Sequence, residues 1–349
     1  MKILVRGTNW IGDAVMSIPA LRELRRIFPD DTITLHTRSW ADGLFQDASF
    51  IDEIVSYEKA KWPVRDILDN SKFLKRDLYD LAVILPNSFE SAITTFLTKI
   101  PRRIGYNKDV RGLLLTDPIP VPEWKNRRHE AYYYLNLIQN VERVVLNRET
   151  VGRFEYDGSL EVSDERREAA RQFLADNGVD LSKPTVAFGV GSANSRAKRW
   201  PLENYARLAE MVISDVGQNV VVVGSKDEVE TAAEVQACSK LPLVNIAGKT
   251  DLALAAALLS EVDLMVSNDM GLSHIAPAVG TKTIVLFGPT DPETTRPFAS
   301  NAFVLREPVE CTPCMLRDCP IDHRCMTRLT PERVFDVVFS AEESDLDEQ

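Results

Sequence analysis

The chain has 349 residues, a length that predicts two domains. Hydrophobic residues make up 44% and charged residues 27%, which is ordinary for a globular protein and excludes disordered and low-complexity classes. The net charge of −11 excludes a nucleic-acid-binding protein that works through a general basic field. The sequence contains no apolar run of the ~18 residues that a membrane span needs, and residues 2–5 are predicted to form a strand rather than the start of a signal peptide. We therefore expect a cytosolic protein whose cysteines are reduced by default.

The charge is distributed unevenly along the chain. Residues 1–150 contain 22 basic and 20 acidic side chains, whereas residues 151–349 contain 19 basic and 32 acidic ones. The two halves therefore favour different partners, unless the acidic half is simply a solvated surface.

Apolar strands alternate with amphipathic helices through the first half. The predicted strands cover residues 2–6, 32–36, 53–56 and 81–85. The predicted helices cover residues 12–28, 88–99 and 129–145. This alternation is typical of a parallel sheet covered by helices on both faces.

The same alternation restarts after a polar stretch. The predicted strands cover residues 185–190, 220–223, 243–246, 264–267 and 283–287. The predicted helices cover residues 163–177, 202–216, 226–239, 252–260, 272–279 and 331–340. We predict two Rossmann-like α/β domains, residues 1–165 and 166–330, followed by a C-terminal helix and tail over residues 331–349. Because open parallel sheets bind ligands at the carboxyl ends of their strands, the two sheets are expected to face a central cleft.

The loop after the first predicted strand carries a candidate general base. Gly7 and Gly12 have the spacing of a P-loop, but Asp13 and Ala14 replace its Lys and its Ser or Thr. Asp13 begins the following helix, where it is either a capping carboxylate or a base. The helix dipole is expected to keep this carboxylate ionised at neutral pH.

A later loop, residues 189–201, favours a phosphate-bearing ligand. It combines Ser192 and Asn194 with the cations Arg196, Lys198 and Arg199. Small residues, hydroxyls and cations at the carboxyl edge of a sheet suit an anion, and the alternative is a solvated basic loop.

Two further loops contribute candidate ligand contacts. The helix that follows residues 264–267 presents its first N–H groups near Gly271, where an anion can bind, and His274 lies one turn further on. Glu228 begins another helix, where it holds ribose hydroxyls or serves only as a helix N-terminal acid.

The cysteines gather near the C-terminus. Cys311, Cys314, Cys319 and Cys325 lie within fifteen residues. Their spacing matches neither a zinc ribbon nor a ferredoxin run, so a structural metal cluster, disulfides and reduced thiols all stay open.

Three segments together resemble glycosyltransferase family 9, the ADP-heptose:lipopolysaccharide heptosyltransferases. These are Gly12-Asp13, the run Lys198-Arg-Trp-Pro201 and the motif from Ser267 to His274, in which Met270 replaces the family's small hydroxyl residue. The resemblance runs from Met1 to about Val338, and residues 8–13 and 85–92 look more like heptosyltransferase II than heptosyltransferase I. It implies the two-domain GT-B fold.

The resemblance also implies roles for individual residues. Asp13 matches the proposed catalytic base. The donor site would comprise Lys198 on the diphosphate, Asp269 on sugar hydroxyls, Met270, Gly271 and His274 around the phosphates, Ser192, Asn194 and Glu228 nearby, and Thr250 beside the adenine. The acceptor site would comprise Asn9, Gly12, Asn87, Ser88 and the basic residues Arg102, Arg103, Arg127 and Arg128. Interfacial aromatic side chains are expected from Trp124 and residues 132–134, and the alternative for this region is a solvated basic loop with core tyrosines.

The function that follows is inverting transfer of heptose from ADP-heptose to a Kdo-lipid A-type inner-core acceptor. No metal or other cofactor is required, and the protein is expected to be cytoplasmic, with peripheral contact at the cytosolic face of the inner membrane. The alternatives are a family-9 transferase with a different acceptor, a GT-B nucleotide-sugar epimerase and a non-enzymatic nucleotide-sugar sensor.

Overall fold

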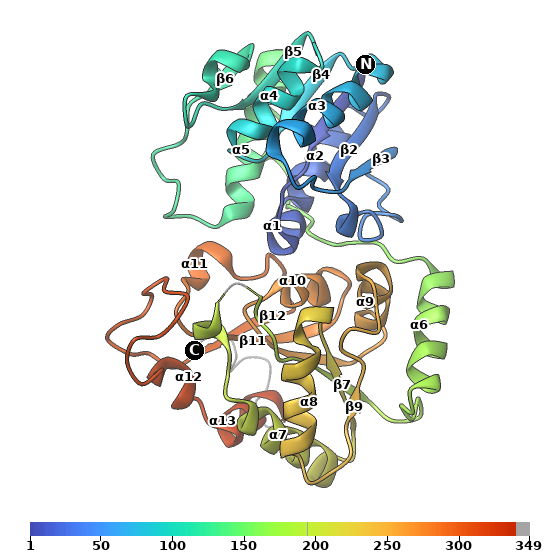
Figure 1. Cartoon of the computed structure of the whole chain (residues 1–349), viewed down its shortest axis with the longest axis vertical. Helices are drawn as coiled ribbons and strands as arrows, with labels where there is room; N and C mark the ends of the chain where they lie inside the picture. Colours follow the sequence, from blue (N-terminus) through green and yellow to red (C-terminus); the bar gives the residue numbers. More distant parts are fainter. Residues whose placement is uncertain (194, 340–349) are drawn as a thin grey trace. The chain divides into compact units, whose positions relative to one another are not determined.

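The computed structural model describes residues 1–193 and 195–339, and the chain divides into two compact units, Met1–Gly158 and Ser159–Gln349. Each unit contains one six-stranded sheet with helices packed against it (Figure 1). All strand pairs are parallel in both sheets, which confirms the predicted α/β fold class.

The first unit has the strand order β3-β2-β1-β4-β5-β6. Its strands are β1 (Lys2–Arg6), β2 (Thr32–Arg38), β3 (Glu53–Tyr57), β4 (Leu81–Ile84), β5 (Arg102–Tyr106) and β6 (Asp117–Ile119). Its helices are α1 (Ile11–Met16), α2 (Ile18–Ile27), α3 (Pro63–Leu74), α4 (Phe89–Leu97) and α5 (Glu130–Leu146). The chain reverses its winding between β1 and β4, and this is the position at which open sheets bind ligands.

The second unit repeats this arrangement with the order β12-β11-β10-β7-β8-β9. Its strands are β7 (Thr185–Gly189), β8 (Asn219–Val223), β9 (Val244–Asn245), β10 (Leu264–Asn268), β11 (Lys282–Phe287) and β12 (Ala302–Arg306). Its helices are α6 (Asp164–Asp176), α7 (Leu202–Met211), α8 (Val229–Cys238), α9 (Leu252–Leu259), α10 (Gly271–Ala278), α11 (Pro292–Thr295), α12 (Arg324–Thr327) and α13 (Pro331–Phe339).

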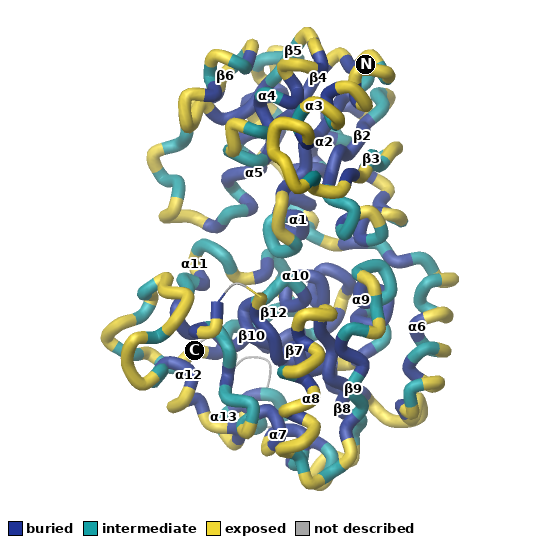
Figure 2. The backbone as a smooth tube through the Cα atoms, viewed as in Figure 1, coloured by how far each residue is buried: buried dark blue, intermediate teal, exposed yellow. Residues whose placement is uncertain are grey.

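The central strands form the core of each unit, and Figure 2 shows them as buried segments. Ile3, Leu4 and Val5 of β1 are each 0% exposed because helices cover both faces of the sheet. In the second unit, Val334 of α13 belongs to the same apolar cluster as Trp200. The helix expected to follow the second domain therefore packs into it.

Several elements differ from the expected ones. The helix predicted over residues 12–28 is divided at Ser17, because Pro19 lacks the N–H that a continuous helix would use. The helix predicted from residue 226 begins as α8 at Val229, after a turn that Ser225 and Glu228 cap. Strands β5, β6 and β12 and helix α3 were not predicted, and β5 contains Arg102 and Arg103, two of the basic residues expected to bind the acceptor.

Candidate active site

Asp13 lies in the first turn of α1, directly after β1, and is the candidate base. Tyr134 of α5 donates a hydrogen bond from its hydroxyl to Asp13 Oδ1 at 3.3 Å. Burial, reinforced by the nearby Glu130 carboxylate, raises the pKa of Asp13 to about 6, although the Tyr134 hydrogen bond and Lys125 oppose this shift. Asp13 is therefore still mostly ionised at pH 7, but burial moves its pKa closer to neutrality than a carboxylate at a helix N-terminus alone would lead one to expect. A base with a pKa near 6 is well matched to a proton transfer at neutral pH.

The neighbouring strand β4 places Asn87 and Ser88 at the same edge of the sheet as Asp13. Tyr133, adjacent in sequence to Tyr134, donates from its hydroxyl to Asn87 Oδ1 at 3.2 Å. Two consecutive tyrosines of α5 thus hold the candidate base and a candidate acceptor-binding amide. Their burial contradicts the expectation of interfacial aromatic side chains at these two positions, since Tyr133 is 1% exposed and Tyr134 is 5% exposed.

Arg111 organises the loop that contains Asn87 and Ser88. Its guanidinium is fully buried, donating to the backbone oxygens of Tyr106, Pro86 and Ser88 and so tying β5 to the loop after β4. Burial lowers the pKa of Arg111 to about 10, so the group remains a cation at neutral pH. The sequence placed Arg111 only within a basic segment, residues 102–128, expected to bind an anionic acceptor, and it gave no sign that this side chain is buried.

The four candidate acceptor-binding arginines divide into two pairs. Arg102 pairs with Asp117 and bonds the Val144 oxygen, and Arg103 bonds the oxygens of Leu114 and Ile100. Arg127 and Arg128 are exposed, as is Asn9, and Gly12 is half-buried. Arg127 and Arg128 are therefore the members of the set that present their charge to solvent.

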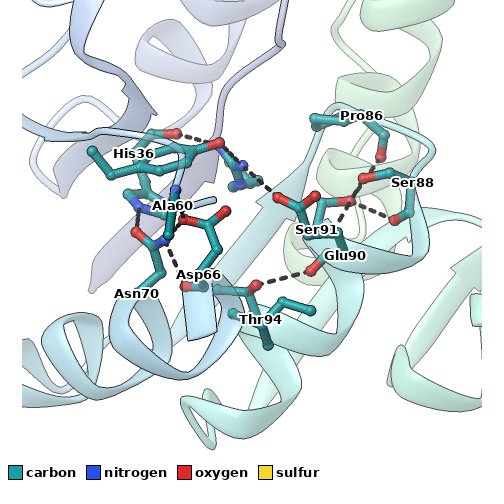
Figure 3. Close-up of polar contacts among 12 residues, drawn as sticks. His36, Ala60, Asp66, Asn70, Pro86, Ser88, Glu90, Ser91 and Thr94 are labelled. Carbon is teal, nitrogen blue, oxygen red and sulfur yellow. Dashed lines mark hydrogen bonds and ion pairs between the residues drawn. The ribbon is translucent and has the colours of Figure 1, made fainter. Parts of the chain in front are cut away.

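A second polar cluster lies at the carboxyl ends of β1, β2 and β3. The buried Arg6 guanidinium bonds the Tyr57 hydroxyl and lies 3.9 Å from the Glu90 carboxylate. His36 approaches Asn70 Oδ1 at 3.1 Å, and burial together with Arg6 lowers the pKa of His36 to about 3 (Figure 3). Arg6, which ends the otherwise largely apolar strand β1, is the feature of the sequence that could have indicated this cluster.

In the second unit, the half-buried Lys198 forms an ion pair with the buried Asp269. Lys198 Nζ lies 2.7 Å from Asp269 Oδ2, and Thr290 Oγ1 donates to the same oxygen at 2.7 Å. Asp269 is 5% exposed. The structure thus brings together the two residues expected on the diphosphate and the sugar, and it adds Thr290 from the turn after β11.

Asn268, beside Asp269, connects the site loops through its side-chain amide. Its Oδ1 accepts from the backbone N–H of Trp200 and from the Tyr205 hydroxyl, each at 3.0 Å. Its Nδ2 donates to the backbone oxygens of Val190 and Gly191. All four hydrogen-bonding positions of this fully buried amide are used, so Asn268 fixes the loop that carries Lys198.

The remaining donor-site candidates are distributed around the carboxyl edge of this sheet. Ser192 and His274 are each 5% exposed, and Glu228 is 3% exposed. Glu228 Oε2 accepts from the N–H and hydroxyl of Ser225, and a side chain at Gly191 would overlap the Glu228 carboxylate. Asn194 lies outside the described residues.

Met270, Gly271 and Thr250 are half-buried. Gly271 begins α10, so the first N–H groups of that helix lie where β10 ends. The Ser273 hydroxyl accepts from the Met270 N–H at 3.2 Å and thereby satisfies the backbone donor at this position.

The cysteine-rich segment packs against the Lys198 loop. Ser195 Oγ donates to the Arg317 oxygen, the Ala197 N–H bonds the same oxygen, and His323 Nε2 lies 2.7 Å from the Ala197 oxygen. The described cysteines are all free thiols, and burial raises the pKa of Cys325 to about 11. Across residues 1–193 and 195–339, no three His, Cys, Asp or Glu side chains are arranged to hold a metal ion.

Two six-stranded parallel sheets, each with polar residues at its carboxyl edge, match the GT-B-like fold of solved heptosyltransferases. The sequence profile of glycosyltransferase family 9 (heptosyltransferase) matches residues 68–324, and the chain therefore belongs to this family. It is 30% identical to lipopolysaccharide heptosyltransferase 2 of Escherichia coli, over 96% of this chain and 97% of that protein. It is 29% identical to lipooligosaccharide heptosyltransferase 2 of Haemophilus influenzae, over 88% of both chains.

Solved structures agree with this assignment. The E. coli ADP-heptose lipopolysaccharide heptosyltransferase II superposes with a TM-score of 0.82 at 28% identity, covering 96% of this chain and 97% of the other. A family 9 glycosyltransferase from Veillonella parvula also gives a TM-score of 0.82, at 21% identity, covering 100% of this chain and 97% of the other, and supports the fold. Among the described helices, none has the length and apolar character needed to span a bilayer.

Proposed function

We propose that the protein transfers heptose from ADP-heptose to the inner core of lipopolysaccharide, in the manner of a heptosyltransferase II. The similarity to the E. coli lipopolysaccharide heptosyltransferase 2, which extends over 96% of this chain, carries the proposal. In this assignment the first unit binds the acceptor and provides the base, and the second unit binds the donor.

The proposed reaction is a single inverting displacement. The acceptor hydroxyl attacks the anomeric carbon of the heptose and passes its proton to Asp13, while the bond from that carbon to the diphosphate oxygen breaks and ADP leaves. The transition state resembles an oxocarbenium ion, as in glycoside chemistry generally. The raised pKa of Asp13, about 6, supports its assignment as the base.

The departing ADP carries negative charge that the second unit is equipped to stabilise. Lys198 provides a cation, and the first N–H groups of α10 provide hydrogen-bond donors. Asp269 holds Lys198 Nζ in place at 2.7 Å, so the cation is positioned by the fold itself. As proposed, these groups stabilise the leaving diphosphate without a metal ion.

The acceptor in this proposal is a Kdo-lipid A-type saccharide that already carries one heptose. Its anionic groups would contact the exposed Arg127 and Arg128, beside the Asn9, Asn87 and Ser88 edge of the first sheet. Because such an acceptor is anchored in lipid, the enzyme would meet it at the cytosolic face of the inner membrane, as a reversible peripheral protein.

Mass spectrometry of the core lipid tests this function. Incubation with ADP-heptose and heptosyl-Kdo2-lipid A is expected to add one heptose to the acceptor, and ADP release without the acceptor is expected to be slow. An unchanged acceptor mass would contradict the proposal. Conversion of ADP-heptose to another sugar without acceptor would instead indicate an epimerase.

A further inference from the structure

Helix α4 has a reversed amphipathic pattern. Its outward side chains are apolar: Phe89, Phe96 and Leu97 are exposed by 48%, 43% and 37%. Its inward side chains carry hydroxyls: Ser91, Thr94 and Thr95 are buried, as is Thr98 directly after the helix. A surface helix ordinarily shows the opposite arrangement, so the apolar side of α4 requires an explanation beyond the packing of this unit.

The inward hydroxyls are satisfied by the helix itself. Thr94 Oγ1 donates to the Glu90 oxygen at 2.8 Å and Ser91 Oγ to the Ser88 oxygen at 2.7 Å (Figure 3). Thr98 Oγ1 donates to the Thr94 oxygen at 2.8 Å. Because these groups have partners inside the unit, the fold tolerates them without loss, and the apolar side chains remain on the solvent side.

Helix α3 packs beside α4 (Figure 1), and it also exposes apolar side chains. Val64 and Leu68, one turn apart, are exposed by 70% and 54%, and Trp62, just before the helix, is exposed by 68%. We call the combined surface the α3–α4 face. It consists of Trp62, Val64, Leu68, Phe89, Phe96 and Leu97. An exposed apolar area of this kind marks an interaction surface in a folded protein.

Cations accompany this face. The Arg103 guanidinium lies 5.4 Å from the Phe96 ring centre. Lys72 follows Val64 and Leu68 at helical spacing along α3, Lys75 comes directly after the helix, and both lysines are exposed. Residues 59–114 contain eleven Lys and Arg against six Asp and Glu, in a chain whose net charge is −11. The segment that contains this face is therefore basic, although the chain as a whole is acidic.

We propose that the α3–α4 face docks on an anionic lipid bilayer. This inference rests on the proposed function, in which the acceptor is lipid-linked. Tryptophan and phenylalanine side chains flanked by lysine and arginine suit the boundary between headgroups and acyl chains, and anionic headgroups attract the cations. A second copy of this chain fits less well, because a symmetric contact would bring the same cations opposite each other.

Sedimentation with vesicles tests this inference without donor or acceptor present. The full chain is mixed with vesicles of phosphatidylcholine alone or of phosphatidylcholine with phosphatidylglycerol, at low and high salt. The variants are F96D/L97D for the apolar part and K72E/K75E for the charged part. The matched control is Leu181→Asp in the second unit, a residue exposed by 51%.

The wild type is expected to bind the anionic vesicles, with weaker binding at high salt because ions screen the headgroup charge. F96D/L97D is expected to lower the partition coefficient by about tenfold or more, because two apolar side chains no longer enter the interface. K72E/K75E is expected to lose the preference for anionic lipid, and Leu181→Asp is expected to behave as the wild type.

Three results would overturn the inference. In the first, F96D/L97D partitions onto vesicles as the wild type does. In the second, the wild type binds neutral and anionic vesicles equally at low salt. In the third, F96D/L97D changes its oligomeric state with no change in lipid binding. Circular dichroism confirms that each variant is folded, and K72E/K75E provides a second test if the first does not fold. Turnover on a deacylated, water-soluble acceptor is expected to be unchanged in both, so failure of the wild type in that assay would contradict the proposed function separately.

Discussion

At the scale of single residues, the environment that raises the pKa of Asp13 suits catalysis but lowers the stability of the fold. Its pKa of about 6 lies above the ordinary 3.8 because burial disfavours the carboxylate. The charge therefore destabilises the fold above pH 6, and this cost vanishes below about pH 4. Functional sites commonly show such a conflict between stability and activity.

Asp13→Asn is the first test of this combination. Without a base, kcat is expected to fall by about 10²–10⁴-fold while ADP affinity persists. The same variant is expected to be more stable than the wild type at pH 8, by up to about 2–3 kcal/mol, and equally stable near pH 4. Kinetics and thermal unfolding at both pH values measure this, and retention of more than about a tenth of kcat would contradict the base assignment.

The pH profile gives an independent test, because two neighbours shift Asp13 in opposite directions. The Tyr134 hydrogen bond lowers the pKa of Asp13 and the Glu130 charge raises it. Activity requires the ionised carboxylate, so it is expected to fall as the pH drops through about 6. Tyr134→Phe is expected to move this acid limb to higher pH, and Glu130→Gln to lower pH. Shifts in the same direction would show that another group titrates.

Variants of Lys198 and Asp269 distinguish an effect on ADP binding from an effect on local stability. Lys198→Ala is expected to weaken ADP binding by about 1–3 kcal/mol, because a charged hydrogen bond to phosphate is lost. It also leaves the buried Asp269 carboxylate with Thr290 but without its cation. Lys198→Met with Asp269→Asn is expected to regain thermal stability but not ADP affinity. Calorimetry distinguishes the two effects, and unchanged ADP affinity in both variants would remove Lys198 from the donor site.

At the scale of elements, Arg111 shows how one side chain orders a loop. Arg111→Lys keeps the charge but loses the forked geometry that reaches the Pro86 and Ser88 oxygens. Acceptor KM is expected to rise about tenfold as the loop loses order, with ADP affinity unchanged. Arg153→Lys, an exposed residue of the same unit, is the control. An unchanged acceptor KM would place the acceptor away from this loop.

The sequence predicted the elements whose hydrophobic pattern is continuous and missed those whose pattern is not. Strands such as β4 and β8 are buried and consist entirely or almost entirely of apolar residues. Strand β5 begins with Arg102 and Arg103, and helix α3 exposes Val64 and Leu68, so neither has the pattern of a covered element. Strand β5 forms because it pairs with β4 and β6, and a local sequence pattern does not reveal such pairing.

The candidate sites show the same limit. The pairing of Lys198 with Asp269 could be anticipated, because both follow neighbouring strands of one parallel sheet. The contribution of Tyr133 and Tyr134 could not, because α5 is remote in sequence and packing alone brings their hydroxyls to Asn87 and Asp13. Family resemblance identified Asp13, whereas the burial that raises its pKa required three-dimensional structure.

At the scale of the whole molecule, the proposed function assigns acceptor binding to the first unit and donor binding to the second. The first half is nearly neutral and the second is acidic, so a polyanionic acceptor is expected to favour the first unit. Arg127 and Arg128 are the suitable residues to test, because Arg102 and Arg103 also hold β5 in place and their reversal would disturb the fold.

Reversal of Arg127 and Arg128 to Glu is therefore expected to raise acceptor KM steeply and to leave ADP-heptose affinity unchanged. Each cation near an anionic membrane contributes about 1 kcal/mol, screened over about 8 Å at physiological salt, so activity should also depend less on salt in this variant. The control is Arg306→Glu with Arg328→Glu, two exposed residues of the second unit. Steady-state kinetics at two salt concentrations measure both effects. If the Arg127 and Arg128 variant keeps its acceptor KM, or loses donor affinity instead, the proposal that the first unit binds the acceptor and the second unit binds the donor is wrong.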